Sequence, residues 1–449
     1  MKASNRRSLG RRMALVKAAA WGALGLSLAG TALPAWSGAA GAATSTAGQP
    51  CATPAPLTPA AAASTTGITS NTVTVGNVSI LTGPVPGLFE GAPTGVKAYF
   101  AYVNSLGGID GRKLVLDGYD DGFSGLANQE DTSTAVAKDF ALVGSFSTFD
   151  GYGCKVLAEN PAVPDVSVTL DPGTNALPND FSAQPLAQGA ATGPFMYIRQ
   201  HYPKETKVAA LVGDVDTTKD AWYGQQAALE HAGFTIAYVN YFSPLATDFT
   251  TQVIAMRSAG VNVLYLTDLD WQWGADIMLD MEQQGWRPTV VFSAGPLYAD
   301  QFVSHAGGAA NTNGILFGQG QALYLGQDAK SIPAVNEFNK WVKVVNPGWT
   351  PDLYTLYGWA SAQLFAQALK AAGAHPTRGA VLKALQGTSA FSASGLLATA
   401  NPAKKLPPNC YLMAQIKNGN YVRIPPTASG FACSGSVYWT VNNTALPAP

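Results

Sequence analysis

The sequence predicts an α/β protein made of two doubly wound parallel-sheet lobes joined by a hinge. Residues 72–168 alternate β-branched runs of strand length with helical stretches, which is the pattern of successive βαβ units. Residues 206–293 repeat this alternation. Between the two arrays, Asp171–Gln188 is rich in Pro, Asn and Asp, a composition typical of a crossing between domains.

The first array opens with a strand, a helix and a second strand. Thr72–Leu81 is a β-branched run. The apolar residues between Val96 and Val103 recur at helical spacing, and Gly107-Gly108 end the helix. The crossover between the two strands should be right-handed. The other strands expected in this array are Lys113–Tyr119, Phe140–Gly144 and Val163–Val168.

The second array contains the same two kinds of element in alternation. Its expected strands are Thr206–Gly213, Phe234–Phe242, Val261–Thr267 and Thr289–Ser293, and its helices are Asp220–Ala232, Asp248–Ala259 and Gly274–Gln284. After a long helix at Tyr354–Gly373, Lys417-Asn-Gly-Asn420 predicts the turn of a β-hairpin.

The composition indicates a globular protein without an electrostatic surface for nucleic acid. The chain has 449 residues, of which 47% are apolar and 12% charged. Its 27 basic and 28 acidic residues leave a net charge of −1. We therefore expect no nucleic-acid partner.

The N-terminus has the features of an export signal. Five basic residues lie between Arg6 and Lys17, followed by an apolar core at Ala18–Leu33 and the small-residue sequence Ala40-Gly-Ala42. This order predicts a signal peptide over residues 1–43, and Arg6-Arg7 also resembles a twin-arginine motif. Residues 44–69 are rich in Ala, Pro, Ser and Thr and predict a linker.

Four cysteines follow the signal peptide, at Cys51, Cys154, Cys410 and Cys433. In an exported protein they can form disulfides, and four cysteines allow three pairings. The predicted hairpin can bring Cys410 and Cys433 together, which favours that pair and leaves Cys51 with Cys154. Lipidation of Cys51 is not expected, because the preceding Gly48-Gln49-Pro50 does not resemble a lipoprotein processing sequence.

Three segments of the first βαβ unit together carry a family resemblance: Leu81-Thr-Gly-Pro84, Val103–Arg112 and Asp120-Asp121. In this order and spacing they resemble the start of type I periplasmic solute-binding proteins, and in particular the branched-chain amino acid and amide branch, which includes leucine-binding protein. Lys219–Gly224 and the helix at Tyr354–Gly373 extend the resemblance to about residues 70–424.

The resemblance implies an exported protein of the periplasm or cell envelope that captures a small organic molecule between its lobes. It implies delivery of that molecule to the membrane subunits of an ABC permease, with the protein acting as a monomer without a cofactor. The alternative is a ligand-sensing protein that reports to a membrane receptor. The implied domains are a first lobe of residues 70–188 with 319–388 and a second lobe of residues 189–318 with 389–449.

Motifs for catalysis and metal binding are not found in the sequence. There is no Gly-x-Ser-x-Gly nucleophile elbow, no His-Glu-x-x-His and no phosphate-binding loop. The four histidines, at 201, 231, 305 and 375, have no ligand spacing, and no Cys-x-x-Cys occurs. We therefore expect neither an enzyme nor a metal site.

Candidate ligand-binding residues follow strand ends, where open parallel sheets bind ligands. The first lobe contributes Leu88 and Phe89 after its first strand. It also contributes the Ser/Thr-rich loop that holds the ligand's carboxylate in the family, here Ser145, Phe146, Ser147 and Thr148. Hydroxyls at a helix N-terminus suit an anion, although helix capping alone explains such residues equally well.

The second lobe contributes Trp222, Tyr223, Asp270 and Trp271. Aromatic side chains offer large flat contact areas to a ligand, but each could also be an ordinary core residue.

One departure from the family pattern concerns the ligand's amino group. Amino acid binders usually place a carboxylate after the last strand of the second lobe, whereas here Phe292–Tyr298 contains none. Asp268 and Asp270, one strand earlier, are either substitutes or ordinary loop carboxylates. An unpaired buried ammonium is costly, so we expect an aromatic acid or amide, with one oxygen-bearing end and Trp271 as the aromatic anchor.

Overall fold

The computed structural model describes residues 51–185, 189–433, 437–438 and 445–446. The predicted signal peptide and residues 44–50 of the predicted linker lie outside this range. No helix in the described part of the chain combines the length and apolar character needed to cross a membrane.

The first lobe is built on a four-stranded sheet with the order β2-β1-β3-β4. All of its pairings are parallel, and β1 and β2 are in register from Thr72 opposite Lys113 to Ser79 opposite Asp120. Because the strands are parallel, their carboxyl ends lie at one edge of the sheet. The strands are β1 Thr72–Ser79, β2 Lys113–Asp120, β3 Leu142–Val143 and β4 Asp165–Val166.

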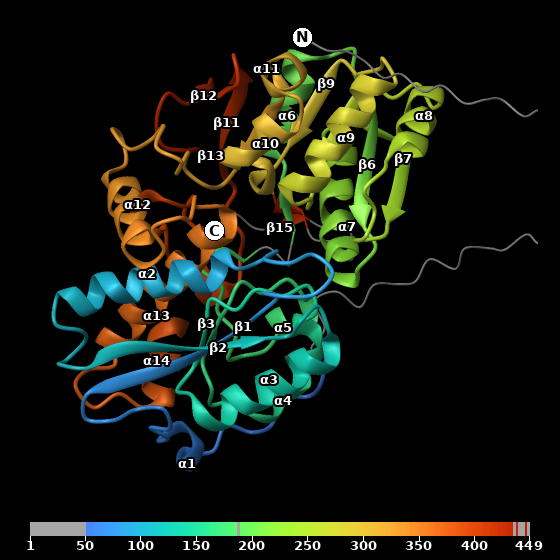
Figure 1. The fold of residues 1–449 in the computed structure, drawn as a ribbon. Coiled ribbons are helices and arrows are strands. Elements are labelled where there is room, and N and C mark those ends of the chain that lie inside the picture. The colour runs from blue at the N-terminus through green and yellow to red at the C-terminus, as the bar shows by residue number, and fades with distance from the viewer. Residues whose placement is uncertain (1–50, 186–188, 434–436, 439–444, 447–449) are drawn as a thin grey trace, which may run out of the picture. The chain divides into compact units, whose positions relative to one another are not determined.

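Helices from both ends of the chain cover this sheet. The helix predicted to return to the first lobe, α13, does so and packs against α2 (Figure 1). A Cβ at Gly95 of α2 would lie 1.9 Å from the carbonyl oxygen of Thr355, so only glycine permits this close approach. Asp352 and Thr355 form a capping box at the start of α13. The helices are α2 Gly91–Ser105, α3 Gly125–Lys138, α4 Asp150–Glu159, α12 Pro333–Val345, α13 Leu353–Ala371 and α14 Arg378–Gln386.

The second lobe has a larger mixed sheet with the order β12-β11-β10-β9-β8-β6-β7. The strands from β6 to β10 pair in parallel, and β11 joins antiparallel to β10. The Asn-Gly turn closes the β11–β12 hairpin as predicted. The strands are β6 Lys207–Gly213, β7 Thr235–Phe242, β8 Val263–Leu266, β9 Val290–Ser293, β10 Leu316–Gln319, β11 Cys410–Lys417 and β12 Asn420–Ile424.

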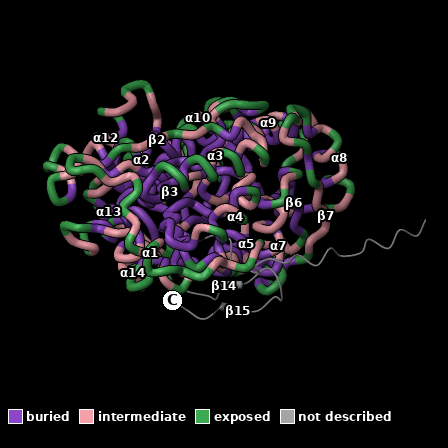
Figure 2. Tube along the Cα trace, turned by 90° about the horizontal axis from the view of Figure 1, so that it is seen from below, coloured by how far each residue is buried: buried purple, intermediate pink, exposed green. Residues whose placement is uncertain are grey.

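Three helices of the second lobe, α7, α8 and α9, begin within four residues of the starts predicted from the sequence, whereas α6, α10 and α11 were not predicted. The helices are α6 Gly193–His201, α7 Asp216–His231, α8 Thr250–Ser258, α9 Trp271–Gln283, α10 Asp300–His305 and α11 Gly308–Thr312. Figure 2 shows buried residues along strands such as β3 and β6. Short elements complete the described chain: α1 Pro59–Ala62, α5 Pro172–Asn175, β5 Ala190–Ala191, β13 Ala432–Cys433, β14 Val437–Tyr438 and β15 Ala445–Leu446.

Residues 51–69 differ from the linker expected for them, because they are anchored to the first lobe. A disulfide joins Cys51 to Cys154 of α4. The Ala55 N–H donates to the Ala158 carbonyl (2.8 Å), and the Arg378 N–H donates to the Ser64 carbonyl (3.0 Å). The second disulfide joins Cys410 of β11 to Cys433 of β13, so the structure has the two pairs favoured above.

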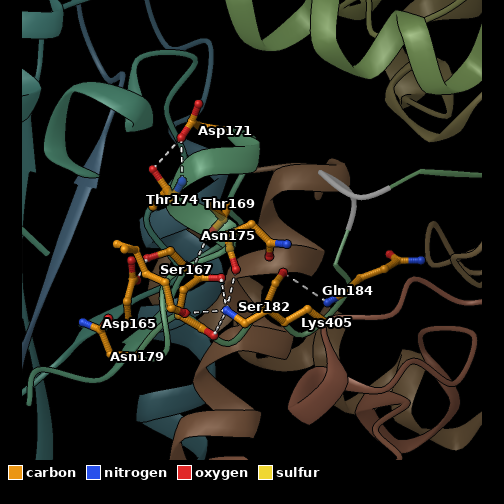
Figure 3. Close-up of polar contacts among 12 residues, drawn as sticks. Asp165, Ser167, Thr169, Asp171, Thr174, Asn175, Asn179, Ser182, Gln184 and Lys405 are labelled. Atoms are coloured by element: carbon orange, nitrogen blue, oxygen red, sulfur yellow. Dashed lines mark hydrogen bonds and ion pairs between the residues drawn. The ribbon is translucent and has the colours of Figure 1, made fainter. Parts of the chain in front are cut away.

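The segment before β11 is held to the first lobe by Lys405 (Figure 3). Its ammonium donates to the carbonyls of Asn175, Leu177 and Asp180 and lies 3.8 Å from the Asp180 carboxylate. Burial lowers the pKa of Lys405 and raises the pKa of Asp180 to about 6. Because its contacts hold Lys405 to the first lobe and β11 of the second lobe begins at Cys410, we propose that the third crossing between the lobes lies at residues 407–409. This is later than the boundary at 389 expected from the sequence.

Candidate ligand-binding cavity

A cavity of about 260 Å³ lies between the strand ends of the two lobes. The first lobe supplies residues that follow β1 and β3, and the second supplies residues that follow β6, β8, β9 and β10. The start of α13 closes part of the wall with Tyr354 and Tyr357. Residues 216–217 of α7 approach the first lobe, because the Thr217 hydroxyl donates to the Thr148 carbonyl (3.2 Å).

Aromatic rings form one side of the cavity. The ring of Phe89 lies 4.5 Å from that of Phe146 and 4.7 Å from that of Tyr354. Phe146 also contacts Tyr354 at 5.0 Å and stacks on Tyr357 at 6.3 Å. Rings that hold one another at such distances form a rigid apolar surface before any ligand arrives.

A second aromatic surface comes from the larger sheet. Tyr265 of β8 and Phe292 of β9 stack with centroids 5.1 Å apart, and Phe195 of α6 meets both rings edge-on at 5.4 and 5.8 Å. All three residues line the cavity. An apolar or flat ligand body can therefore lie between aromatic surfaces of the two lobes.

Two carboxyl groups from the loop after β8 also line the cavity. Asp268 accepts hydrogen bonds from Gln225 Nε2 (2.8 Å) and the Thr267 hydroxyl (2.9 Å). Burial raises the pKa of Asp268 to about 6, although these two bonds lower it. Asp270 is 7% exposed, and burial together with the nearby Asp352 carboxylate raises its pKa to about 7.

The charge of the cavity wall is therefore exclusively acidic among the described residues. Asp268 and Asp270 are its charged side chains, and no Lys, Arg or His side chain lines it. An ionised carboxylate in such a site lacks a counter-ion, which is why protonation is favoured. A ligand that brings a positive charge or an N–H donor would restore the ionised form.

The sequence of the chain decides its family. The model of the family described as periplasmic binding protein matches residues 72–420. The chain belongs to this family. The Leu/Ile/Val-binding protein homolog 1 of Brucella suis is 28% identical to it over 302 residues, which cover 63% of this chain and 73% of that relative. This relationship confirms the resemblance carried by the first βαβ unit.

Solved structures share the fold of this periplasmic binding protein. The fatty acid ABC transporter substrate-binding protein from Thermomonospora curvata superimposes with a TM-score of 0.69 at 16% identity, covering 85% of this chain and 97% of that one. A solute-binding protein from R. palustris in complex with benzoate gives a TM-score of 0.65 at 16% identity, with coverages of 81% and 97%. The two-lobed α/β architecture predicted from the sequence is thus confirmed.

Six of the residues that the sequence analysis singled out lie in the cavity wall of this periplasmic binding protein. They are Leu88, Phe89, Phe146, Thr148, Asp268 and Asp270. Each follows the carboxyl end of a strand, which is the reason they were chosen and the reason they converge.

The two serines of the Ser/Thr loop instead accept hydrogen bonds from backbone N–H groups. Ser145 Oγ accepts a hydrogen bond from the Val78 N–H (3.0 Å), and Ser147 Oγ accepts one from the Phe149 N–H (3.0 Å). Both line a separate polar cavity of about 30 Å³ behind the loop. They shape the loop, whereas Thr148 is its hydroxyl residue at the main cavity.

The remaining aromatic candidates lie outside the main cavity wall. Trp222 is 0% exposed and belongs to the core between α7 and the larger sheet, and Tyr223 packs against the same core. Trp271 contacts the His305 ring at 4.8 Å, whereas Trp273 lines the cavity. Residues two apart on a helix point in different directions, so the rotation of α9 selects Trp273.

Sequence reasoning missed several residues of the wall. Tyr354 and Tyr357 were assigned only to the returning helix; their spacing of three at its first turn was the available signal. Tyr265 and Phe292 lie inside predicted strands and carried no separate signal. In the described part of the chain, no group of three or more His, Cys, Asp or Glu residues could hold a metal ion.

Proposed function

We propose that this chain is an exported solute-binding protein that captures a small organic molecule between its lobes and delivers it to an ABC permease. The family, the two lobes and the cavity between opposed strand ends support this function. Closure of two lobes on a ligand removes water from it and changes the surface that a permease would contact.

The ligand in this proposal has an apolar or aromatic body and an amine or ammonium head. The observation that carries it is the pair of cavity carboxyls, Asp268 and Asp270, in a wall without cationic side chains. An ammonium group would pair with them, whereas an acid without an amine would add a third negative charge. We therefore propose an aromatic or apolar amino acid as the ligand, in place of the aromatic acid or amide expected from the sequence.

The carboxylate of an amino acid would need hydroxyl or N–H donors in the same cavity. Thr148, Thr217 and Thr218 line the cavity, and α7, a helix of 16 residues, begins at Asp216. Hydroxyls and the first N–H groups of a helix stabilise anions. The similarity to proteins named for Leu, Ile and Val binding supports an amino acid as well.

Calorimetry with a panel of amino acids, their deaminated acids and their amides tests this assignment. We expect micromolar binding of apolar or aromatic amino acids and no binding of the deaminated acids. Asp270→Asn should abolish the binding, while the control Asp300→Asn, at an exposed acid, should not change it. Tight binding of the deaminated acids, unaffected by Asp270→Asn, would contradict the proposed head group.

Delivery to a permease needs a separate test in the cell. Deleting the gene should abolish uptake of the radiolabelled ligand, and the wild-type gene should restore it while the Asp270→Asn gene should not. Normal uptake in the deletion strain, with loss of a transcriptional response to the ligand, would instead favour the sensing role.

A further inference from the structure

We propose that Phe123 is a further ligand-binding residue: a strained turn after β2 holds its ring over the end of the cavity farthest from the crossings, where the ring excludes water from the charged head of the ligand. This inference rests on the proposed function, since it concerns the same cavity. It assigns a role to the loop after β2, which supplied no candidate in the sequence analysis.

Phe123 lies at the outer end of the cavity. It follows β2, an edge strand of the four-stranded sheet, whereas β4, which precedes the first crossing, forms the opposite edge. Pro244 of the second lobe also lines the cavity and follows β7, the edge strand of the larger sheet. Gln319 of β10 and Pro408 line the cavity at the crossings. Four strand spacings, about 19 Å, separate β7 from β10, so Phe123 and Pro244 belong to the end away from the crossings.

The backbone of Phe123 is held in the left-handed region, with a φ of 66°. This region is unfavourable for a bulky side chain, because its Cβ approaches the following carbonyl oxygen. Of the non-glycine residues with a positive φ in the described chain, Phe123 and Asp268 are the two that line the cavity. Strained residues gather at ligand-binding sites, where the surrounding structure holds them, so the strain points to a function at this cavity.

Two carboxylates fix the turn that carries Phe123. Asp121 Oδ1 accepts a hydrogen bond from the Phe123 N–H (3.1 Å). Asp120 Oδ1 accepts one from the Gly122 N–H (3.0 Å) and one from the Leu81 N–H (2.9 Å) in the loop after β1. All three donors are backbone groups, so a glycine at position 123 would keep these bonds and remove the strain. The turn therefore does not need the phenylalanine ring, and the role of the ring lies in what it contacts.

The ring of Phe123 is supported by the first lobe and remains accessible to the cavity. Phe149 meets it edge-on, with centroids 5.1 Å apart. Phe149 in turn contacts the ring of Tyr152 at 6.1 Å, and Tyr152 is 53% exposed and lies outside the cavity wall. Phe123 itself is partly exposed and lines the cavity. A ring that is held in this way can bury its remaining surface against a ligand.

The outer end is the side from which water would reach the head group of the ligand. Asp268 and Asp270 follow β8, which is separated from the edge strand β7 by β6. The stacked rings of Tyr265 and Phe292 lie on β8 and β9, toward the crossings. An amino acid whose body lies on these rings therefore has its head toward the outer end. Opposite charges attract more strongly where water is excluded, so a ring over this end would strengthen the ion pair.

Calorimetry with phenylalanine and leucine as probes tests the contact. Phe123→Ala and Phe123→Gly both remove the ring, so we expect each to bind the probes at least about tenfold more weakly than the wild type. Phe123→Leu keeps an apolar side chain over the cavity and should stay within about threefold. The control Tyr152→Ala removes a ring on the outer side of Phe149 and should leave the affinity within about twofold.

Ionic strength provides a readout that a purely structural role of Phe123 would not change. Salt screens an ion pair that is open to water much more than a covered one. Between about 0.05 M and 0.5 M NaCl the affinity of the wild type should fall less than about twofold, whereas that of Phe123→Gly should fall by about threefold or more.

Urea unfolding tests the strain separately from binding. Phe123→Gly and Phe123→Ala lose the same ring, but only glycine adopts a positive φ without strain. The glycine variant should therefore unfold at a higher urea concentration than the alanine variant, although both bind the probes equally weakly. Equal midpoints for the two variants would show that the turn stores no strain and would contradict the first step of the inference.

The binding results separate this inference from the proposed function. If the wild type binds phenylalanine or leucine and Phe123→Gly binds it equally well, the contact with Phe123 is refuted while the proposed function stands. If neither probe binds the wild type, the ligand class proposed above fails, and the role of Phe123 fails with it.

Discussion

Replacing Asp270 with asparagine should make the ligand-free protein more stable while it weakens ligand binding. Asp270 precedes α9, lies in the cavity wall and is 7% exposed. Asparagine has nearly the same shape and can still accept hydrogen bonds, so the substitution removes the charge without opening a hole. The two effects have opposite signs because the charge of Asp270 destabilises the ligand-free protein but would pair with the ammonium group of the proposed ligand.

The size of the effect follows from the pKa of Asp270. It rises from 3.8 to about 7, chiefly through burial. Ionisation of Asp270 is therefore more costly in the folded protein than in the unfolded chain. The contribution of this residue to the free energy of unfolding is highest below pH 3.8, falls as the pH rises from 3.8 to 7, and stays reduced above pH 7. At 1.36 kcal/mol per pKa unit, the full cost of ionising Asp270 in the folded protein is about 4 kcal/mol. A carboxylate that lines a cavity can relax and attract water, which reduces this cost. We therefore expect Asp270→Asn to raise the free energy of unfolding by about 1–3 kcal/mol at pH 8.

Urea unfolding at pH 8 and at pH 5, with and without ligand, measures both effects. Asp270→Asn should raise the free energy of unfolding of the ligand-free protein at pH 8 and change it less at pH 5. Asp300→Asn should stay within about 0.5 kcal/mol of the wild type at both pH values. If Asp270→Asn instead destabilises the ligand-free protein equally at both pH values and leaves ligand affinity unchanged, the carboxylate supports the fold and our reasoning is wrong.

Four further predictions concern the cavity, the disulfides and the motion of the lobes. Affinity for an amine ligand should rise between pH 5.5 and pH 8, because the two cavity carboxyls, with pKa values of about 6 and 7, must ionise to pair with it; a flat calorimetric pH profile would count against this pairing. Trp273→Ala should weaken ligand binding by about 2–4 kcal/mol, whereas Trp271→Ala, the matched control on the same helix, should leave it nearly unchanged. Peptide mapping without reduction should recover the Cys51–Cys154 pair, which spans 103 residues, and its removal should cost about 3–5 kcal/mol in unfolding experiments; free thiols there would refute the anchoring of residues 51–69. The radius of gyration measured by X-ray scattering should decrease when ligand is added, and superimposable curves would argue against lobe closure.

The sequence alone was sufficient for the fold class, the order of most elements and the family. Strand and helix periodicities are local, so runs such as Thr72–Leu81 and the helix at Tyr354–Gly373 can be recognised without knowing their neighbours. The position of Phe89, Phe146 and Asp270 in the cavity could also be predicted, because the carboxyl ends of parallel strands share one edge of a sheet.

Only the tertiary structure decided which of two neighbouring tryptophans lines the cavity. The sequence analysis chose Trp271 as the aromatic anchor, whereas the rotation of α9 about its axis directs Trp273 to the cavity. Ser145 could equally have bound an anion, until the structure placed the Val78 N–H at its oxygen.

The largest part hidden from the sequence is the polar chemistry at the crossings. Gln184 meets Gln321 across 137 residues, and Lys405 meets Asp180 across 225 residues. The periodicity of the sequence shows which side of a helix or strand is apolar, but it gives no information about the distances between different elements. Hydrogen bonds and pKa values depend on separations of a few ångströms and on burial by residues far away in the chain, so these partners become visible only when both lobes are folded.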